Sequence, residues 1–135
     1  MPDLHGERRR RVVIADDDPG YVRFLAMVVE ANDAFEVVGL AANGEEAVQL
    51  AVWQNADVVL MDIDMPKIDG LRATQLLCKS RSRACVLLVS GVEDERLEEA
   101  RSVGAAGLIA KSSGSAAIED MLEMLATSAD VQTGS

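Results

Sequence analysis

Residues 58–70 read VVLMDIDMPKIDG, an apolar run that ends in a carboxylate at Asp62. A short run rich in β-branched residues is typical of a strand that is buried on both of its faces. The charge that follows such a strand has to emerge at the edge of the sheet. The stretch therefore predicts a central strand with Asp62 at its carboxyl end.

Two other apolar runs also end in charged residues. Residues 12–15 (VVIA) precede Asp16 and Asp17, and residues 107–110 (GLIA) precede Lys111. The carboxyl ends of parallel strands meet at one edge of a sheet, so these acids and the lysine are expected to converge there. Acidic groups and a lysine at one edge indicate phosphate and metal chemistry.

Strand-like runs alternate with helical patterns along the whole chain. The predicted strands are Arg11–Asp16, Phe35–Ala41, Asp57–Asp62, Ala84–Ser90 and Ala106–Lys111. Such alternation predicts right-handed crossovers and a parallel sheet with helices on both faces. The predicted fold is α/β, a doubly wound, flavodoxin-like sheet of five parallel strands flanked by five helices. Its order, 2-1-3-4-5, is adopted from known sheets of this kind and places the first and third strands side by side.

The helix boundaries have recognisable sequence features. Asp18 before Pro19, and Asn43 further along, are predicted N-caps. Two further helices are expected near residues 69–79 and 94–103. The last helix is expected to end near Leu125, because apolar periodicity is lost from residue 126 onward. We therefore divide the chain into a flexible basic tail (1–10), one domain (11–127) and a C-terminal tail or truncated linker (128–135).

Composition sets limits on function. The chain has 135 residues, about one domain, and a formal net charge of −10. This charge argues against direct nucleic-acid contact by the domain, because phosphate binding needs clustered Lys and Arg on the contacting face. The one basic cluster, Arg8–Arg11, is interpreted as a solubilising tail or a charged start to the first strand.

The cysteines and the histidine indicate neither a disulfide framework nor a Cys/His metal site. Cys78 and Cys85 lie seven residues apart and His5 is in the N-terminal tail, so both cysteines are expected to be small core residues. No apolar run approaches the roughly 18 residues that a membrane span requires. A cytoplasmic protein without a membrane segment is expected.

Over residues 11–125 the chain resembles the receiver domain of bacterial two-component response regulators, the CheY-like superfamily. In that family a strand ends in a phosphoacceptor Asp that is followed by Met-Pro and Asp-Gly. The residues that carry the resemblance are Asp16, Asp17, Asp62, Met65, Pro66, Asp69, Gly70, Ser90 and Lys111. The resemblance implies that a sensor histidine kinase or a histidine phosphotransfer protein is the phosphodonor. It also implies a downstream output domain or partner protein, and a homodimer that forms on phosphorylation is a further expectation.

The residues also fit this chemistry by themselves. Mg²⁺ prefers octahedral oxygen ligands and is typically held by one or two carboxylates plus phosphate oxygens. Asp17 and Asp62 meet this requirement, and Asp16 can position a metal-bound water. Asp62 is the expected nucleophile and would form an aspartyl phosphate. Mg²⁺, the Lys111 ammonium and the Ser90 hydroxyl would together supply the positioning and the charge neutralisation that phosphoryl transfer needs.

Ser90 is also expected to act as the switch. It would move toward phosphorylated Asp62, take Gly91 and Val92 with it, and reshape the face built from the fourth helix, fifth strand and fifth helix. Many receivers have Phe or Tyr three residues before the lysine, whereas this chain has Leu108. Leu108 can fill the space that Ser90 vacates but offers a partner no hydroxyl and less bulk.

Asp64, two residues past the expected phosphoacceptor, is a second departure from the family. Its backbone carbonyl is expected to be the third protein ligand of Mg²⁺. Its carboxylate would overlook the phosphate, where it either repels an incoming anionic donor or the product, or orients water. Our hypothesis is that it slows labelling by small phosphodonors.

Two alternative functions remain at this stage. Asp62-Ile63-Asp64 resembles the nucleophile motif of haloacid dehalogenase-like phosphatases, although Pro66 stands where that motif usually has Thr or Val. A pseudo-receiver would bind partners without phosphorylation, although all the key acids are present. The chain is either a single-domain regulator or the receiver of a longer protein.

Overall fold

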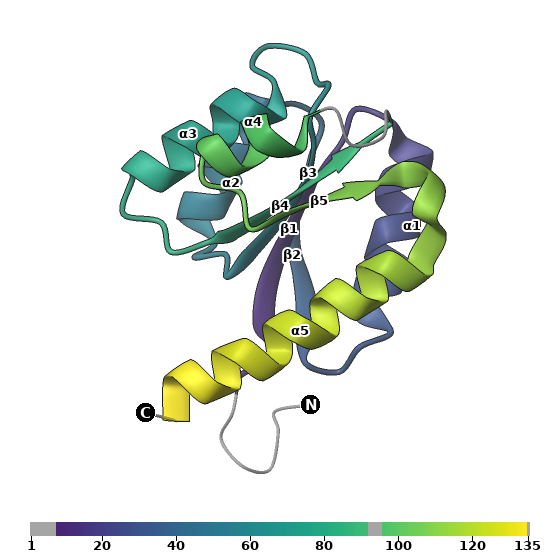
Figure 1. Ribbon diagram of the computed structural model, residues 1–135, viewed down its shortest axis with the longest axis vertical. Coiled ribbons are helices and arrows are strands. Elements are labelled where there is room, and N and C mark those ends of the chain that lie inside the picture. The colour runs from purple at the N-terminus through teal and green to yellow at the C-terminus, as the bar shows by residue number, and fades with distance from the viewer. Residues whose placement is uncertain (1–7, 92–95, 135) are drawn as a thin grey trace.

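The computed structural model describes residues 8–91 and 96–134, with side chains as far as residue 127 (Figure 1). This part does not include His5, Val92 of the expected switch segment, or Asp94 of the expected fourth helix. The elements, in chain order, are β1 (Arg10–Ala15), α1 (Pro19–Glu30), β2 (Phe35–Ala41), α2 (Gly44–Trp53), β3 (Val58–Asp62), α3 (Gly70–Lys79), β4 (Cys85–Ser90), α4 (Leu97–Ser102), β5 (Gly107–Ala110), a short 3-10 turn η1 (Lys111–Ser113) and α5 (Gly114–Gly134).

The five strands form one parallel sheet in the order β2-β1-β3-β4-β5, which confirms the predicted fold. Helices α1 and α5 cover one face, and α2, α3 and α4 cover the other (Figure 1). Alternate residues of β1 enter different core layers: Ile14 packs on the side of α1 and α5, and Val13 packs on the opposite side. This two-sided burial explains why residues 12–15 of β1 and residues 58–61 of β3 are apolar without interruption.

The register of the sheet brings the predicted functional residues to one edge. Ala15 pairs with Met61, so Asp16 and Asp62 follow at the ends of adjacent strands. Asp62 pairs with Val89, and Ser90 pairs with Ala110, which places Ser90 and Lys111 at the same edge.

The predicted N-caps are confirmed. The carboxylate of Asp18 accepts a hydrogen bond from the Gly20 amide (2.9 Å) at the start of α1. The side-chain oxygen of Asn43 accepts one from the Glu46 amide (2.9 Å) at the start of α2. Each cap satisfies one of the backbone donors that a helix leaves unpaired at its N-terminus.

The loop between β3 and α3 holds the carboxyl end of β3 close to a helix start. Asp69 caps α3 by accepting a hydrogen bond from the Arg72 amide (2.8 Å). A Cβ atom at Gly70 would overlap the carbonyl oxygen of Asp62 and lie 2.9 Å from the Cα of Ile63. Only glycine allows this close approach of the two backbones.

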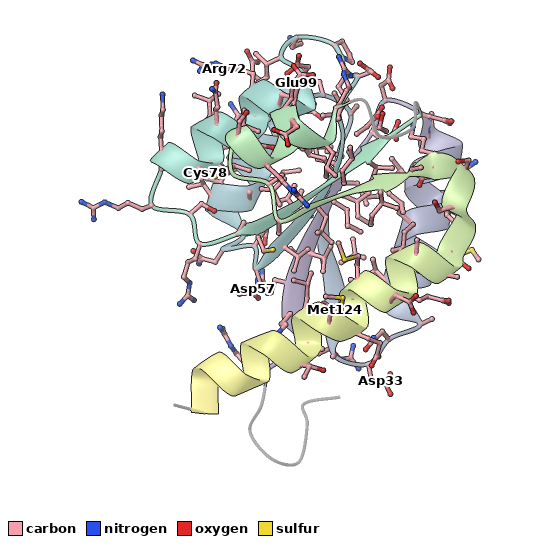
Figure 2. The ribbon with its side chains drawn as sticks, in the orientation of Figure 1. Asp33, Asp57, Arg72, Cys78, Glu99 and Met124 are labelled. Atoms are coloured by element: carbon pink, nitrogen blue, oxygen red, sulfur yellow. The ribbon has the colours of Figure 1, made fainter. Side chains whose placement is uncertain are left out.

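Two expectations are wrong. Helix α5 continues to Gly134 instead of ending near Leu125. Loss of apolar periodicity marks the end of contact with the core and does not by itself end a helix. Cys78 is exposed, because α3 turns Ala73, Thr74 and Leu77 inward and leaves Cys78 on its flank (Figure 2). Cys85 is half-buried.

Candidate functional site

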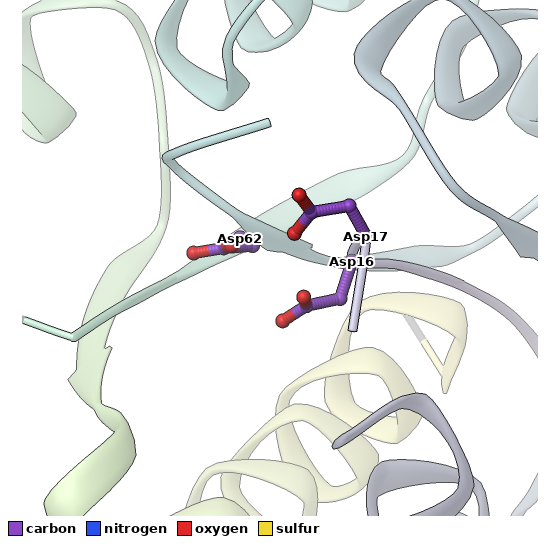
Figure 3. Close-up of side chains that lie close together, drawn as sticks. All are labelled: Asp16, Asp17 and Asp62. Atoms are coloured by element: carbon purple, nitrogen blue, oxygen red, sulfur yellow. The ribbon is translucent and has the colours of Figure 1, made fainter. Parts of the chain in front are cut away.

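Three carboxylates form an acidic cluster, defined here as Asp16, Asp17 and Asp62 (Figure 3). One ligand oxygen from each lies within 4.8 Å of the others. Asp16 and Asp62 are buried, with 2% and 5% of their surface exposed, while Asp17 is exposed at the rim. The cluster arises from the sequence because the apolar strands β1 and β3 are neighbours and both end in acids.

The two oxygens of Asp16 have different environments. Oδ1 accepts a hydrogen bond from the Asp18 amide (2.9 Å), which fixes the carboxylate at the start of the β1–α1 turn. Oδ2 lies 2.8 Å from Lys111 Nζ, an ion-pair contact. Among the described residues no other donor contacts this buried oxygen, which has a second lone pair. It therefore has capacity for a further electropositive partner.

Lys111 supplies the cation of the site from the end of β5. Its Nζ atom lies 3.6 Å from Asp62 Oδ2 and 4.5 Å from the centre of the Tyr21 ring. Burial lowers the pKa of Lys111, but the contact with Asp16 and the charge of Asp62 outweigh this effect, so that the net pKa is raised. Lys111 is therefore fully charged at neutral pH.

Asp62 is the acid with the most perturbed proton affinity. Burial and the neighbouring charge of Asp16 raise its pKa to about 6, against the opposing effects of Lys111 and of a hydrogen bond from the Asp64 amide. The charge of a neighbouring carboxylate disfavours ionisation of the buried Asp62. A single lysine does not compensate fully for this repulsion.

These features fit a divalent cation such as Mg²⁺. The cluster offers hard oxygen donors, which this ion prefers. Asp16 Oδ2 has no donor besides Lys111 among the described residues, and burial together with the charge of Asp16 raises the pKa of Asp62. A divalent ion would relieve both conditions.

Ser90 and Leu108 lie on β4 and β5, the two strands that follow β3 in the sheet. Ser90 is fully buried at the end of β4. Leu108 pairs with Leu88 in the neighbouring strand and packs, partly buried, against the core layer on the side of α2, α3 and α4. The structure thus brings both predicted switch residues to the β4–β5 pair.

Two residues near the site had no feature in the sequence that identified them. Arg96 Nη1 lies 3.0 Å from Asp64 Oδ1, so the Asp64 carboxylate is paired. Tyr21, the single tyrosine of the chain, places its ring under Lys111. Both contacts depend on how helices pack over the sheet edge, which strand patterns do not report.

The fold and the site together define the class of the protein. The family model for the response regulator receiver domain matches residues 12–123, and the chain belongs to this family of two-component signalling domains. The chain is 35% identical over 113 residues to the transcriptional regulatory protein LiaR of Bacillus subtilis, covering 83% of this chain and 54% of LiaR. It therefore spans about half the length of that relative.

Solved structures agree with this assignment. The signal receiver domain of the response regulator NarL from Mycobacterium tuberculosis has a TM-score of 0.84 at 28% identity, over 90% of this chain and 98% of that chain. A chain of the CheX–CheY–BeF3–Mg²⁺ complex from Borrelia burgdorferi has a TM-score of 0.78 at 28% identity, over 86% and 88% of the two chains. Within the described residues, no helix is both long and apolar enough to span a bilayer.

Proposed function

We propose that this receiver accepts a phosphoryl group on Asp62 in a Mg²⁺-dependent reaction, with a sensor histidine kinase or a histidine phosphotransfer protein as the donor. The observation that carries the proposal is the buried Asp16–Asp62 pair bridged by Lys111 Nζ, at 2.8 Å from Asp16 and 3.6 Å from Asp62. It combines a nucleophile, a cation site and a fixed positive charge at one sheet edge.

The chemistry follows from these positions. An Asp62 carboxylate oxygen forms a bond to phosphorus while the bond from phosphorus to the donor atom breaks, and the donor atom keeps the electron pair. Lys111 neutralises charge on the phosphoryl oxygens, which is the main demand of phosphoryl transfer. Asp17, Asp62 and the Asp64 backbone carbonyl would hold Mg²⁺, with Asp16 acting through a water, and the ion would supply further neutralisation.

The switch follows from the new charge. Phosphorylation adds nearly two negative charges and strong acceptor oxygens, toward which the Ser90 hydroxyl turns. Ser90 pairs in the sheet with Ala110, so its movement reaches β5 and the α4–β5–α5 face. Leu108 follows Ser90 in place of an aromatic ring. This face then controls an output domain or partner protein, and a homodimer on phosphorylation is part of the same proposal.

The cellular setting belongs to the proposal as well. A cytoplasmic protein that exchanges phosphoryl groups with a kinase fits the two-component family. The net charge of −10 favours protein partners over direct contact of this domain with nucleic acid.

Labelling with acetyl phosphate tests the proposal. Intact mass should rise by one phosphoryl group in Mg²⁺, and the gain should disappear with a chelator or in Asp62→Asn. Asp33→Asn, an exposed acid at the opposite end of the sheet, is the matched control and should label normally. No labelling of the folded wild-type protein under any of these conditions would favour the pseudo-receiver.

The phosphatase alternative has a different signature. It requires steady turnover of unrelated phosphate esters and loss of that turnover in Asp64→Asn. The pairing of Asp64 with Arg96 counts against a role for Asp64 as a free general acid. We expect no such turnover.

A further inference from the structure

Tyr21 lies between the acidic cluster and the core. It is the third residue of α1, and its ring packs with the core layer beside Phe24, 5.5 Å away between ring centres. Its other neighbour is Lys111 Nζ, 4.5 Å from the ring centre. An ammonium within about 6 Å of an aromatic face is attracted by the ring quadrupole.

The tyrosine hydroxyl does not account for this placement. It is buried, and no described residue forms a hydrogen bond with it. Burial and the charges of Asp16 and Asp62 raise the pKa of Tyr21, against the effect of Lys111, so the ring stays neutral. The feature that Lys111 encounters is the aromatic face.

Among the described residues Lys111 has three neighbours that attract it, and the proposed chemistry would change two of them. Asp16, the closest at 2.8 Å, would turn toward the cation site when metal binds. Asp62 loses its free carboxylate when it is phosphorylated. The Tyr21 ring is the one neighbour of the three that keeps the same charge throughout.

We propose that Tyr21 is a positioning residue whose ring holds the Lys111 ammonium at the pocket when the Asp16 contact is given up, so that Lys111 is ready to meet the phosphoryl oxygens. This inference rests on the proposed function. The proposed role requires the aromatic ring of Tyr21 and not its hydroxyl.

The test compares Tyr21→Phe, which keeps a ring, with Tyr21→Leu, which does not. Phe24→Leu is the matched control, because it removes the adjacent ring of the same helix, which packs beside Tyr21 in the same core layer. Beryllofluoride with Mg²⁺, followed by NMR on the full chain, is the probe for a phosphoryl-like ligand. The Lys111 ε-methylene protons report ring contact directly through their upfield shift.

We expect the upfield shift to persist in wild-type protein and in Tyr21→Phe when Mg²⁺ is added. Beryllofluoride affinity should fall about three- to tenfold in Tyr21→Leu, with Mg²⁺ affinity within about twofold of wild type. Tyr21→Phe and Phe24→Leu should bind beryllofluoride as wild type does.

Loss of the upfield shift on Mg²⁺ binding would overturn the inference, as would wild-type beryllofluoride affinity in Tyr21→Leu. Equal losses in Tyr21→Leu and Phe24→Leu would also overturn it, because they would indicate core damage. The proposed function fails separately, if wild-type protein takes up neither acetyl phosphate label nor beryllofluoride.

Discussion

Arg96 and Asp64 form an ion pair, with 3.0 Å between Nη1 and Oδ1, that joins the loop after β3 to the start of α4. Arg96 also lies 3.8 Å from Glu99 through Nε. The charge of Asp64, two residues past the proposed phosphoacceptor, is thus partly neutralised by a residue next to the proposed switch face.

This pair predicts how Asp64 affects labelling. In Arg96→Gln the Asp64 carboxylate loses its counter-charge and should slow the acetyl phosphate reaction, whereas Asp64→Asn should speed it. Both side chains are partly exposed, so each effect should be about two- to fivefold and should shrink at high salt. An acetyl phosphate rate that Asp64→Asn leaves unchanged would contradict a repulsive role for this acid.

The affinity for Mg²⁺ should depend on pH. The pKa of Asp62 is raised to about 6, so the carboxyl becomes protonated as the pH falls through that value and metal binding must then release a proton. The dissociation constant for Mg²⁺, measured by calorimetry, should be flat above about pH 7 and should increase roughly tenfold for each unit below about pH 5.5. A constant affinity from pH 5 to pH 8 would contradict this coupling between protonation of Asp62 and metal binding.

Without metal, Asp62 should destabilise the fold. Its folded pKa of about 6 lies above the ordinary value of 3.8, so the folded state binds the proton more tightly than the unfolded state. The penalty is therefore present in full above pH 6 and fades as the pH falls toward 4. Asp62→Asn should raise the free energy of unfolding by about 2 kcal/mol at pH 8 and by much less at pH 4. Urea denaturation with a chelator measures both values, and a loss of stability at pH 8 would contradict the sign of this argument.

Gly70 should be intolerant of even the smallest side chain. A Cβ atom there would overlap the Asp62 carbonyl oxygen, and backbone cannot yield as a flexible side chain can. Gly70→Ala should lower the free energy of unfolding by about 1–3 kcal/mol. Gly91→Ala is the matched control, because a Cβ atom there meets nothing within 4 Å. Equal stabilities of the two variants would indicate that the β3–α3 loop relaxes freely.

The sheet and most of the acidic site could be predicted because they depend on local patterns. Apolar runs that end in charge marked the strand ends, and parallel pairing then brought Asp16, Asp62 and Lys111 to one edge. The strand order came from known sheets of this kind and not from the residues.

The contacts that were missed depend on packing between elements. Tyr21 meets Lys111, and Arg96 meets Asp64, because helices α1 and α4 begin beside the sheet edge. Nothing in the spacing of these residues reports the distance between helix and loop. The exposure of Cys78 has the same origin, because it depends on which flank of α3 meets the sheet.

The most direct test locates the phosphoryl group. Trypsin places the acids of the acidic cluster in different peptides, because it cleaves after Arg11, Arg23 and Lys67. Peptide 12–23 contains Asp16 and Asp17, and peptide 24–67 contains Asp62. After labelling in Mg²⁺, borohydride should reduce the aspartyl phosphate to homoserine. Fragmentation should then find homoserine at position 62, within peptide 24–67. Homoserine in peptide 12–23, or at Asp64, would contradict the assignment of Asp62 as the phosphoacceptor.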